Sequence, residues 1–507
     1  MVTIEDIQNN ENYSDYVKSK IIDIINNNEG LILTDYILET MVRLIRGENL
    51  LCVGPGGTGK STTQKLCDYI YSPHEILRLA PTGMAAINMY VNAKTIHSIL
   101  KIGEKSLLAW DWQRVRRHIL KNKSMIKEML DPIKLFIFDE FSMIISGLFD
   151  TINKIYNIIY DCNSGNPFGG RQVLFMGDNM QLPPVPNLED IYSDNIRRYL
   201  NDDDYLINND YFKTLFNNTN IIHYNNNLRL TNNNSNETLR FNKFLENART
   251  GFKMCTDDET DECLRFINSR RWHGSLQENN QELFNLYNNS LKTTLKNNSV
   301  DAINNNKIDE LISNGNNTEI FERDINMDII AFRNKYSHNH QDPDKRYNSI
   351  VKFMDNLNGY KKEFIAVVGE RVMLRANNVH DRLKNGSLGE ILEIHDNDIL
   401  VKFDTLDENV TVMKNTWTHP DYSDFKVTAF PLIPAWAITI HKLQGQTIRS
   451  PLFILLNDMK NDYPHLLYTA ISRITDINNL YIINNNPLLK EHFPVNEMNL
   501  NWYIENC

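Results

Sequence analysis

Short apolar runs alternate with longer stretches of mixed apolar and polar residues along most of the chain. Each run ends in glycine or polar residues, and the runs occupy residues 50–53, 135–138, 173–176, 328–332, 451–456 and 480–483. Runs of this length that are flanked by turn-forming residues predict buried strands. Strands that alternate with helices are typical of parallel α/β layers, so we expect an α/β protein with two such halves.

The pattern changes in the second half of the chain. Residues 232–322 are rich in asparagine and weakly patterned, which predicts helices over residues 239–249 and 281–295 within a surface insertion. After residue 370, short β-like runs follow one another at residues 372–374, 390–394, 399–403 and 410–412. The dipeptide Asn385-Gly386 is typical of a hairpin turn. We expect a small β-barrel inserted into the second α/β half.

Composition narrows the class of protein. A chain of 507 residues is too long for one core, so several domains are expected. The net charge of −11 argues against a coat-type nucleic-acid binder but leaves room for a local basic groove. The six cysteines form no C-x-x-C pair and the first ten residues are polar, which favours a reducing intracellular setting. No apolar run reaches membrane-spanning length.

A glycine-rich loop follows the first predicted strand. It consists of Gly54, Pro55, Gly56, Gly57, Thr58, Gly59, Lys60 and Ser61, and a predicted helix over residues 61–71 comes next. This order of strand, G-x-x-x-x-G-K-S loop and helix predicts a nucleoside triphosphate site, because glycines let backbone N–H groups close around phosphate oxygens. Lys60 can reach the β- and γ-phosphates, and Ser61 can hold Mg²⁺.

Two further strand ends carry polar residues suited to hydrolysis. The run at residues 135–138 ends in Asp139 and Glu140, which predicts a Mg²⁺ ligand and a base for the attacking water. The run at residues 173–176 is followed by Gly177-Asp178-Asn179-Met180-Gln181. The amide of Gln181 carries both donors and an acceptor, so it can sense the γ-phosphate and water. Alternatively, these segments are a helix N-cap and a proline-terminated turn.

Longer motifs carry a specific resemblance. They read APTGMAA at residues 80–86, TIHS at 95–98, FSM at 141–143, PFGG at 167–170, GDNMQLPPV at 177–185, NGSLG at 385–389, AWAITIHKLQGQT at 435–447 and LYTAISR at 467–473. In this order, from about residue 33 to residue 475, the chain resembles the Pif (petite integration frequency) family of DNA helicases. The resemblance implies superfamily-one motors that use ATP and Mg²⁺ and move 5′ to 3′ on single-stranded DNA.

The resemblance also implies roles for individual residues. Arg473 would be an arginine finger, Arg229 a second one, and Gly445 part of the nucleotide site. Contacts to single-stranded DNA would come from Pro81, Thr82, Gly83, His97 and His441. Basic and aromatic residues over residues 110–127 would form a strand-separating wedge or, alternatively, the solvated face of an amphipathic helix. Arg229 and His97 also have ordinary alternatives, a surface arginine and a core histidine.

One position departs from the family pattern. Where the family has a glutamine that reads the adenine edge, upstream of the phosphate loop, this chain has Ile37. An isoleucine makes no hydrogen bonds through its side chain. We therefore hypothesise that base selectivity is relaxed and that other triphosphates are used.

These observations predict two RecA-like parallel-sheet motor domains with a small inserted β-barrel and a short wedge insertion. The expected segments are a polar lead-in at 1–30, a first motor domain at 31–218 with a wedge at about 101–130, the start of a second motor domain at 219–335 with an asparagine-rich insertion at about 268–318, the barrel at 336–430 and the end of the second motor domain at 431–507.

The expected function is an ATP-dependent DNA helicase that acts as a monomer. Its partners would be single-stranded DNA and DNA forks or duplex junctions, in replication, recombination or repair, with no membrane involved. We expect an intracellular protein, in a nucleus or at a viral replication site in the cytoplasm. Two alternatives stay open: a RecD-like or RNA-directed superfamily-one motor, and a nucleic-acid-binding scaffold with a degenerate ATPase.

Overall fold

The chain forms two compact units in a computed structural model. The structure describes residues 4–28, 32–81, 89, 93–96, 99, 112–161, 167–183, 202–228, 230, 235–272, 280–327, 329–330, 344, 347–348, 350–351, 354, 362–376, 379–380, 383, 386–419, 422–456 and 464–506. Unit 1 comprises residues 1–271, 460–479 and 486–507, and unit 2 comprises residues 272–459 and 480–485. Among the described helices, none combines the length and the apolar character needed to cross a bilayer.

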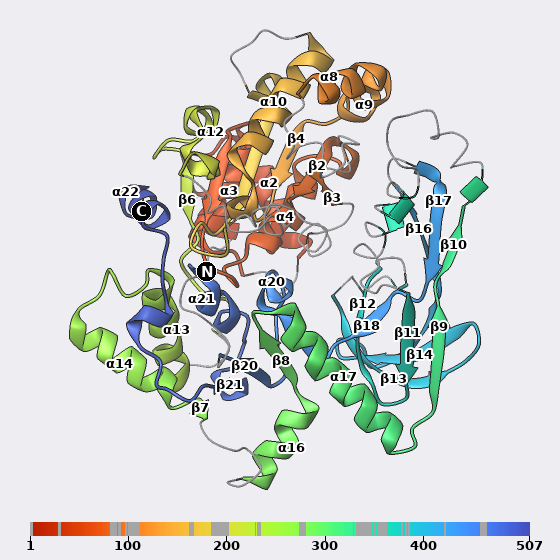
Figure 1. The fold of residues 1–507 in the computed structure, drawn as a ribbon. Coiled ribbons are helices and arrows are strands. Elements are labelled where there is room, and N and C mark those ends of the chain that lie inside the picture. The colour runs from red at the N-terminus through yellow and green to blue at the C-terminus, as the bar shows by residue number, and fades with distance from the viewer. Residues whose placement is uncertain are drawn as a thin grey trace. The chain divides into compact units, whose positions relative to one another are not determined.

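Unit 1 is built on a six-stranded sheet in the order β3-β2-β4-β5-β1-β6 (Figure 1). Its strands are β1 (Leu50–Val53), β2 (Ile76–Ala80), β3 (Lys94–Thr95), β4 (Leu135–Phe138), β5 (Gln172–Gly177) and β6 (Ile221–His223). Every neighbouring pair runs parallel. The strands expected at residues 50–53, 135–138 and 173–176 are confirmed, and so is the parallel α/β class.

Helices cover both faces of this sheet. The helices of unit 1 are α1 (Ile4–Gln8), α2 (Asp15–Asn26), α3 (Asp35–Ile45), α4 (Lys60–Leu66), α8 (Trp112–Lys121), α9 (Lys123–Leu130), α10 (Ser146–Tyr160), α12 (Asp210–Leu215), α13 (Asn236–Arg249), α14 (Asp257–Asn268), α21 (Leu466–Ile471) and α22 (Glu497–Asn506). Side chains of α8, α9, α10 and α12 bury one face, and those of α1, α2 and α3 bury the other. Each strand therefore lies between two apolar layers, as is usual for parallel sheets.

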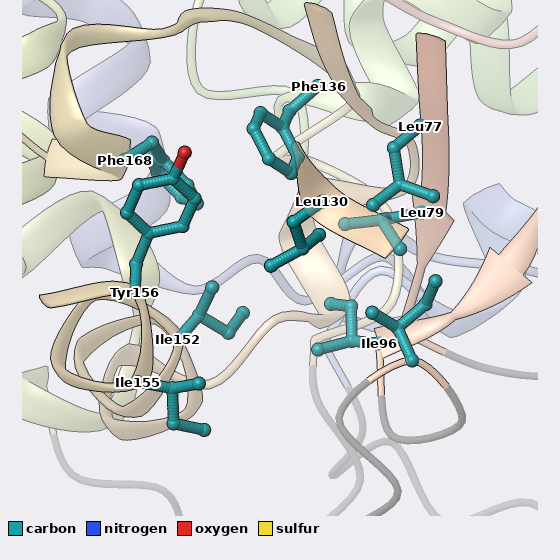
Figure 2. A pocket seen from close by; sticks show the side chains of 10 residues that line it. Leu77, Leu79, Ile96, Leu130, Phe136, Ile152, Ile155, Tyr156 and Phe168 are labelled. Atoms are coloured by element: carbon teal, nitrogen blue, oxygen red, sulfur yellow. The ribbon is translucent and has the colours of Figure 1, made fainter. Parts of the chain in front are cut away.

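The first of these faces contains a small apolar cavity of about 20 Å³. Figure 2 shows side chains of β2 and β4 directed toward it from one side and those of α10 from the other, and the lining residues are Leu77, Leu79, Ile96, Ile99, Leu130, Phe136, Ile152, Ile155, Tyr156 and Phe168. A lining of this kind offers phosphate oxygens no charge and hardly any hydrogen-bond donors. The cavity is thus a packing defect of the core and not a nucleotide site.

Unit 2 contains a second sheet in the order β19-β8-β20-β21-β7, in which the pairs β19–β8, β8–β20 and β20–β21 run parallel. Its strands are β7 (Arg271–Trp272), β8 (Leu291–Thr294), β19 (Ala437–Thr439), β20 (Leu452–Leu455) and β21 (Leu480–Ile483), and the helices α16 (Gln281–Asn289), α17 (Asn297–Ser313) and α20 (Ile440–Leu443) accompany them. The strands expected at residues 451–456 and 480–483 are confirmed.

The prediction of a strand at residues 328–332 is wrong, because residues 329–330 are helical. The strand that completes the second sheet is β8, inside the asparagine-rich stretch that we expected to be an insertion. All four residues of β8 are buried although three of them are polar, Lys292, Thr293 and Thr294. A search for apolar runs cannot find such a strand. Its residues are mostly polar, and they are buried because neighbouring strands of the sheet cover them.

Antiparallel strands fill the middle of unit 2. A five-stranded sheet has the order β15-β14-β13-β12-β18, a three-stranded sheet the order β10-β17-β16, and β9 pairs with β11. Their bounds are β9 (Thr318–Glu322), β10 (Asp324–Asn326), β11 (Glu363–Val367), β12 (Arg371–Leu374), β13 (Leu388–Ile394), β14 (Asp398–Phe403), β15 (Asn409–Met413), β16 (Asn415–His419), β17 (Tyr422–Ala429) and β18 (Leu432–Pro434). The four β-like runs after residue 370 are confirmed as strands, whereas their closure into a barrel stays a prediction.

Candidate nucleotide site

The candidate site of unit 1 lies where three neighbouring strands end. Gly54 follows β1, Asp139 follows β4 and Asp178 follows β5, and the register places Val53 beside Gly177 and Phe138 beside Phe175. Because parallel strands end at one edge of a sheet, the loops that follow them meet there. The sheet order therefore brings the phosphate loop and both acidic strand ends together.

The phosphate loop requires glycine at particular positions. Gly57 and Gly59 have φ of 89° and 94°, in the left-handed region that disfavours other residues. A Cβ on Gly54 would lie 2.1 Å from the backbone oxygen of Tyr224. Lys60 Nζ donates to the backbone oxygens of Gly54 at 2.6 Å and of Pro55 at 2.8 Å, so the lysine lies along the loop.

Ile37 lies directly beneath this loop. It is fully buried on α3, and its Cδ1 lies 2.9 Å from the position that a Cβ on Gly59 would take. The side chain therefore supports the loop by packing against Gly59. Whether the chain selects a base is not decided by this contact, and relaxed selectivity stays a hypothesis.

The two carboxylates after β4 are held differently. Asp139 Oδ2 accepts a hydrogen bond of 2.7 Å from Gln64 Nε2 on α4, and burial raises the pKa of Asp139 although this bond and Lys60 oppose the rise. Glu140 has φ of 51° and ψ of 47°, a left-handed conformation that costs a non-glycine residue energy. These dihedral angles turn the backbone at Glu140 away from the direction of β4.

Oppositely charged groups influence one another at this edge of the sheet. Burial lowers the pKa of Lys60, and the carboxylates of Asp178, Glu140 and Asp139 oppose that effect. Burial likewise lowers the pKa of Arg473, again opposed by Glu140. Unit 1 thus brings Arg473 within electrostatic reach of Glu140, although 333 positions separate them in the sequence.

Arg473 is held by its own neighbours. It follows α21, is 2% exposed, and donates from Nε to the backbone oxygen of Thr469 at 3.1 Å and from Nη2 to Ser472 Oγ at 2.9 Å. These hydrogen bonds fix the orientation of the guanidinium group. A fixed arginine within electrostatic reach of Glu140 is the arrangement expected of an arginine finger.

The residues present fit Mg²⁺. Ser61 and Gln64 are one helical turn apart on α4, and Gln64 Nε2 donates to Asp139, so α4 carries both Ser61 and the hydrogen-bond partner of Asp139. Both are oxygen ligands, which Mg²⁺ prefers. Within the described residues no group of three or more His, Cys, Asp or Glu side chains could hold a metal. Mg²⁺ would therefore depend on phosphate oxygens for the rest of its ligands.

Other predicted site residues lie elsewhere or cannot be placed. Gly445, with φ of 77°, and the exposed His441 belong to unit 2. Pro81 follows β2 and is half-buried. Arg229, Thr82, Gly83, His97 and the first wedge residue, Trp110, lie outside the described residues. Within the described part of the wedge segment, Arg116, Arg117 and Lys121 are exposed on α8.

Sequence reasoning missed three side chains that shape the site. Gln64 could have been found, since it lies three positions after Ser61 and so on the same face of a helix. Asp178 was part of a noted motif but received no role. Arg249, which pairs with Asp178 at 2.7 Å, gives no local signal because 71 positions separate the two residues.

Comparisons with known proteins show what the chain is similar to. Residues 25–259 match the family model described as PIF1-like helicase. The chain is 36% identical over 157 residues to the ATP-dependent DNA helicase PIF1 of Emericella nidulans, a match that covers 30% of this chain and 20% of that protein. The chain therefore spans about a fifth of the length of the curated relatives it matches.

Solved structures extend the likeness along the chain. The Pif1 of Bacteroides sp in complex with ADP-AlF4 is 25% identical, with a TM-score of 0.62 over 94% of this chain and 97% of that one. A Pif1 structure described as showing DNA unwinding at forked dsDNA by two coordinating helicases is 26% identical, with a TM-score of 0.63 and the same coverage. The fold of both units is thus shared with these helicases.

Proposed function

We propose that the chain belongs to the PIF1-like helicase family and that it is an ATP-dependent DNA helicase. The observation that supports this most is the convergence, at one sheet edge of unit 1, of the phosphate loop, Glu140 and Arg473. A scaffold with a degenerate ATPase does not need the phosphate loop, Glu140 and Arg473 together.

The residues have separate roles in hydrolysis. The loop of residues 54–61 would bind the phosphates, with Lys60 on the β- and γ-phosphates. Glu140 would take a proton from the attacking water while the water oxygen bonds to the γ-phosphorus and the bond to the β–γ bridging oxygen breaks, which gives ADP and phosphate. Arg473 would stabilise the charge on the transferring phosphoryl group. Mg²⁺, when bound through Ser61 and Asp139, supplies neutralising charge to the phosphates.

Single-stranded DNA is the proposed track. Among the relatives, one Pif1 of Bacteroides is described as bound to ssDNA and another Pif1 structure as acting on forked dsDNA. By the same positions, Pro81, Thr82, Gly83, His97 and His441 would contact the DNA backbone, and Arg229 and Gly445 would complete the nucleotide site. Movement 5′ to 3′ rests on the resemblance alone.

The organisation and location are part of the proposal. We propose two motor domains divided near residue 218, with the antiparallel region at about 336–430 inserted in the second, and a protein that acts as a monomer. The described cysteines Cys52, Cys67, Cys255 and Cys263 are free thiols, which supports a reducing intracellular setting, in a nucleus or at a viral replication site.

The decisive experiment compares unwinding of duplexes with a 5′ or a 3′ single-stranded tail. The wild-type protein should unwind the 5′-tailed duplex with ATP and Mg²⁺, and Lys60→Ala should abolish both unwinding and DNA-stimulated hydrolysis. RNA in place of DNA distinguishes an RNA-directed motor. Unchanged DNA-stimulated hydrolysis in Lys60→Ala would refute the proposal.

Base selectivity is a second part of the proposal. Ile37 occupies the position where the family has an adenine-reading glutamine, and its side chain packs beneath Gly59. Turnover rates for ATP, GTP, CTP and UTP should therefore be comparable at saturating DNA. Strict preference for ATP would show that another residue reads the base.

A further inference from the structure

Asp178 connects the phosphate sensor to two helices that are distant in the sequence. It follows β5, is fully buried, and accepts hydrogen bonds through both carboxylate oxygens. The donors are Met180 N at 3.1 Å, Arg249 Nε at 3.0 Å and Arg249 Nη2 at 2.7 Å on Oδ1, and Gln181 Nε2 at 3.3 Å and Tyr468 OH at 3.3 Å on Oδ2. One carboxylate therefore holds Gln181, α13 and α21 at once.

The contact with Asp178 defines the orientation of the Gln181 amide. An ionised carboxylate only accepts hydrogen bonds, so the Gln181 atom that faces it must be the NH₂ group. The carbonyl Oε1 then faces the other way. It is buried and has no hydrogen-bond partner among the described residues. A buried acceptor without a donor costs free energy, which indicates that a bound molecule supplies the donor.

The ion pair with Arg249 keeps Asp178 ionised. Burial by itself would raise the pKa of Asp178, but the Arg249 guanidinium, together with Lys60 and the Met180 N–H group, outweighs burial and holds the pKa at about 2. Arg249 is itself 5% exposed, with its guanidinium 4.4 Å from the centre of the Tyr503 ring on α22. A protonated Asp178 could donate to either end of the amide and would leave its orientation undefined.

The other contact of Asp178 reaches the helix before the arginine finger. Tyr468 lies on α21, and its backbone oxygen accepts from Ser472 N at 2.9 Å. Ser472 in turn accepts from Arg473, so α21 and the finger share hydrogen bonds. The same carboxylate thus fixes Gln181 on one side and the support of Arg473 on the other.

We propose that Asp178 is a positioning residue that orients Gln181, so that the carbonyl Oε1 accepts from the attacking water and the second Nε2 hydrogen is left for the γ-phosphate. This proposal rests on the proposed ATP hydrolysis. Asp178 itself touches neither water nor phosphate in it. In this proposal Asp178 acts on kcat through the Gln181 amide, whereas the hydrogen bond from Tyr468 OH to Asp178 holds α21 in place.

A double-mutant cycle between the two residues tests this. Asp178→Asn offers an amide that donates or accepts, so Gln181 loses its fixed orientation, and kcat for ATP should fall about 10- to 100-fold with KM within about threefold. Gln181→Ala should lower kcat similarly. In the Gln181→Ala background, Asp178→Asn should cause no further loss of kcat.

A purely structural role predicts a different result. Asp178→Asn would then lower kcat by the same factor with and without Gln181, and this outcome, or an unchanged kcat, would overturn the proposal. Absence of any DNA-stimulated hydrolysis in the wild-type protein would instead refute the proposed function.

Folding of the variants is controlled separately. Asp178→Asn leaves a buried guanidinium without its carboxylate, which is strongly destabilising. If that variant does not fold, Asp178→Asn combined with Arg249→Met removes both charges and replaces it in the cycle, with the wild type and Gln181→Ala as the references. Arg249→Lys keeps a cation beside Asp178 and should retain kcat within about fivefold at a lower melting temperature.

Discussion

The side-chain nitrogen Nε2 of Gln64 donates a 2.7 Å hydrogen bond to Oδ2 of Asp139. The helix that follows the phosphate loop thereby holds the carboxylate that follows β4. Gln64→Met should remove the bond while filling a similar volume, and about 10-fold more Mg²⁺ should be needed for nucleotide binding. A Mg²⁺ titration with a fluorescent ATP analogue measures this.

A matched control for this variant exists in the same unit. Gln172 is also buried and donates to the backbone oxygens of Leu44 and Glu48, away from the site. Gln172→Met should lower the melting temperature without changing the Mg²⁺ requirement. If both variants behave alike, Gln64 has no special relation to the metal.

Gly59→Ala should disable the phosphate loop. The new Cβ would meet Ile37 Cδ1 at 2.9 Å, and φ of +94° costs an alanine about 1–2 kcal/mol. Gly47→Ala introduces similar backbone strain, since φ is +83°, but its Cβ would have nothing within 4 Å. We expect nucleotide affinity to fall at least about 10-fold in Gly59→Ala only. Equal affinity in the two variants would contradict the argument.

Glu370 should destabilise the protein increasingly as the pH rises. It is fully buried, neither carboxylate oxygen has a hydrogen bond of ordinary geometry among the described residues, and burial raises its pKa from 4.5 to about 8 although the Val367 backbone opposes the rise. The unfolded chain ionises this group above pH 4.5 and the folded chain does not, so stability falls between pH 4.5 and 8. Glu370→Gln removes this cost, on the order of 3 kcal/mol at pH 7.5.

Melting temperatures at pH 5 and pH 7.5 measure the effect of Glu370→Gln. The variant should exceed the wild type at pH 7.5 and nearly equal it at pH 5. Glu390→Gln on the exposed face of β13 is the control and should change little at either pH. A Glu370→Gln variant that is less stable than the wild type at pH 7.5 would point to a partner for the carboxylate.

His465 should destabilise the protein as the pH falls, in the direction opposite to Glu370. Burial lowers its pKa to about 4, with Asp178 opposing and Arg249 assisting, and its Nε2 accepts from Asn496 N at 3.0 Å. The unfolded chain binds the proton near pH 6.5 and the folded chain only near pH 4, so stability is lost as the pH falls through this window. His465→Asn should flatten that slope, because asparagine has no side chain that titrates in this range. The variant should fold, because asparagine also tolerates the φ of 63°.

The loss of stability on acidification is measured by melting temperature between pH 4 and pH 7. The exposed His74 serves as control, and His74→Asn should keep the wild-type slope. If His465→Asn keeps the slope as well, other groups are responsible for acid sensitivity.

The apolar cavity should matter for stability and not for hydrolysis. Leu130→Ala enlarges a space that is already imperfectly filled, so it should cost about 2–5 kcal/mol. Leu120→Ala on the exposed part of α8 should cost far less, since Leu120 is 43% exposed. Melting curves and ATPase rates at a permissive temperature separate the two effects. A large loss of kcat in folded Leu130→Ala would mean that the cavity communicates with the site.

Local signals determined much of this protein. The strand, glycine loop and helix of residues 50–66 follow from apolar runs and from backbone positions that only glycine fits, and the acidic strand end after β4 follows from the same pattern. Long motifs gave the family and the candidate residues Lys60, Asp139, Glu140, Gln181 and Arg473. Such features depend on neighbours in the chain, so the sequence alone carries them.

Tertiary structure decided the rest. The polar strand β8 is buried by its neighbours in the sheet, so its own residues did not reveal it. The bond between Gln64 and Asp139, the ion pair between Asp178 and Arg249, and the reach of Glu140 to Arg473 join residues 71 to 333 positions apart. Pairings over such separations are set by the sheet order and by which charges share a buried space, and no local pattern encodes them.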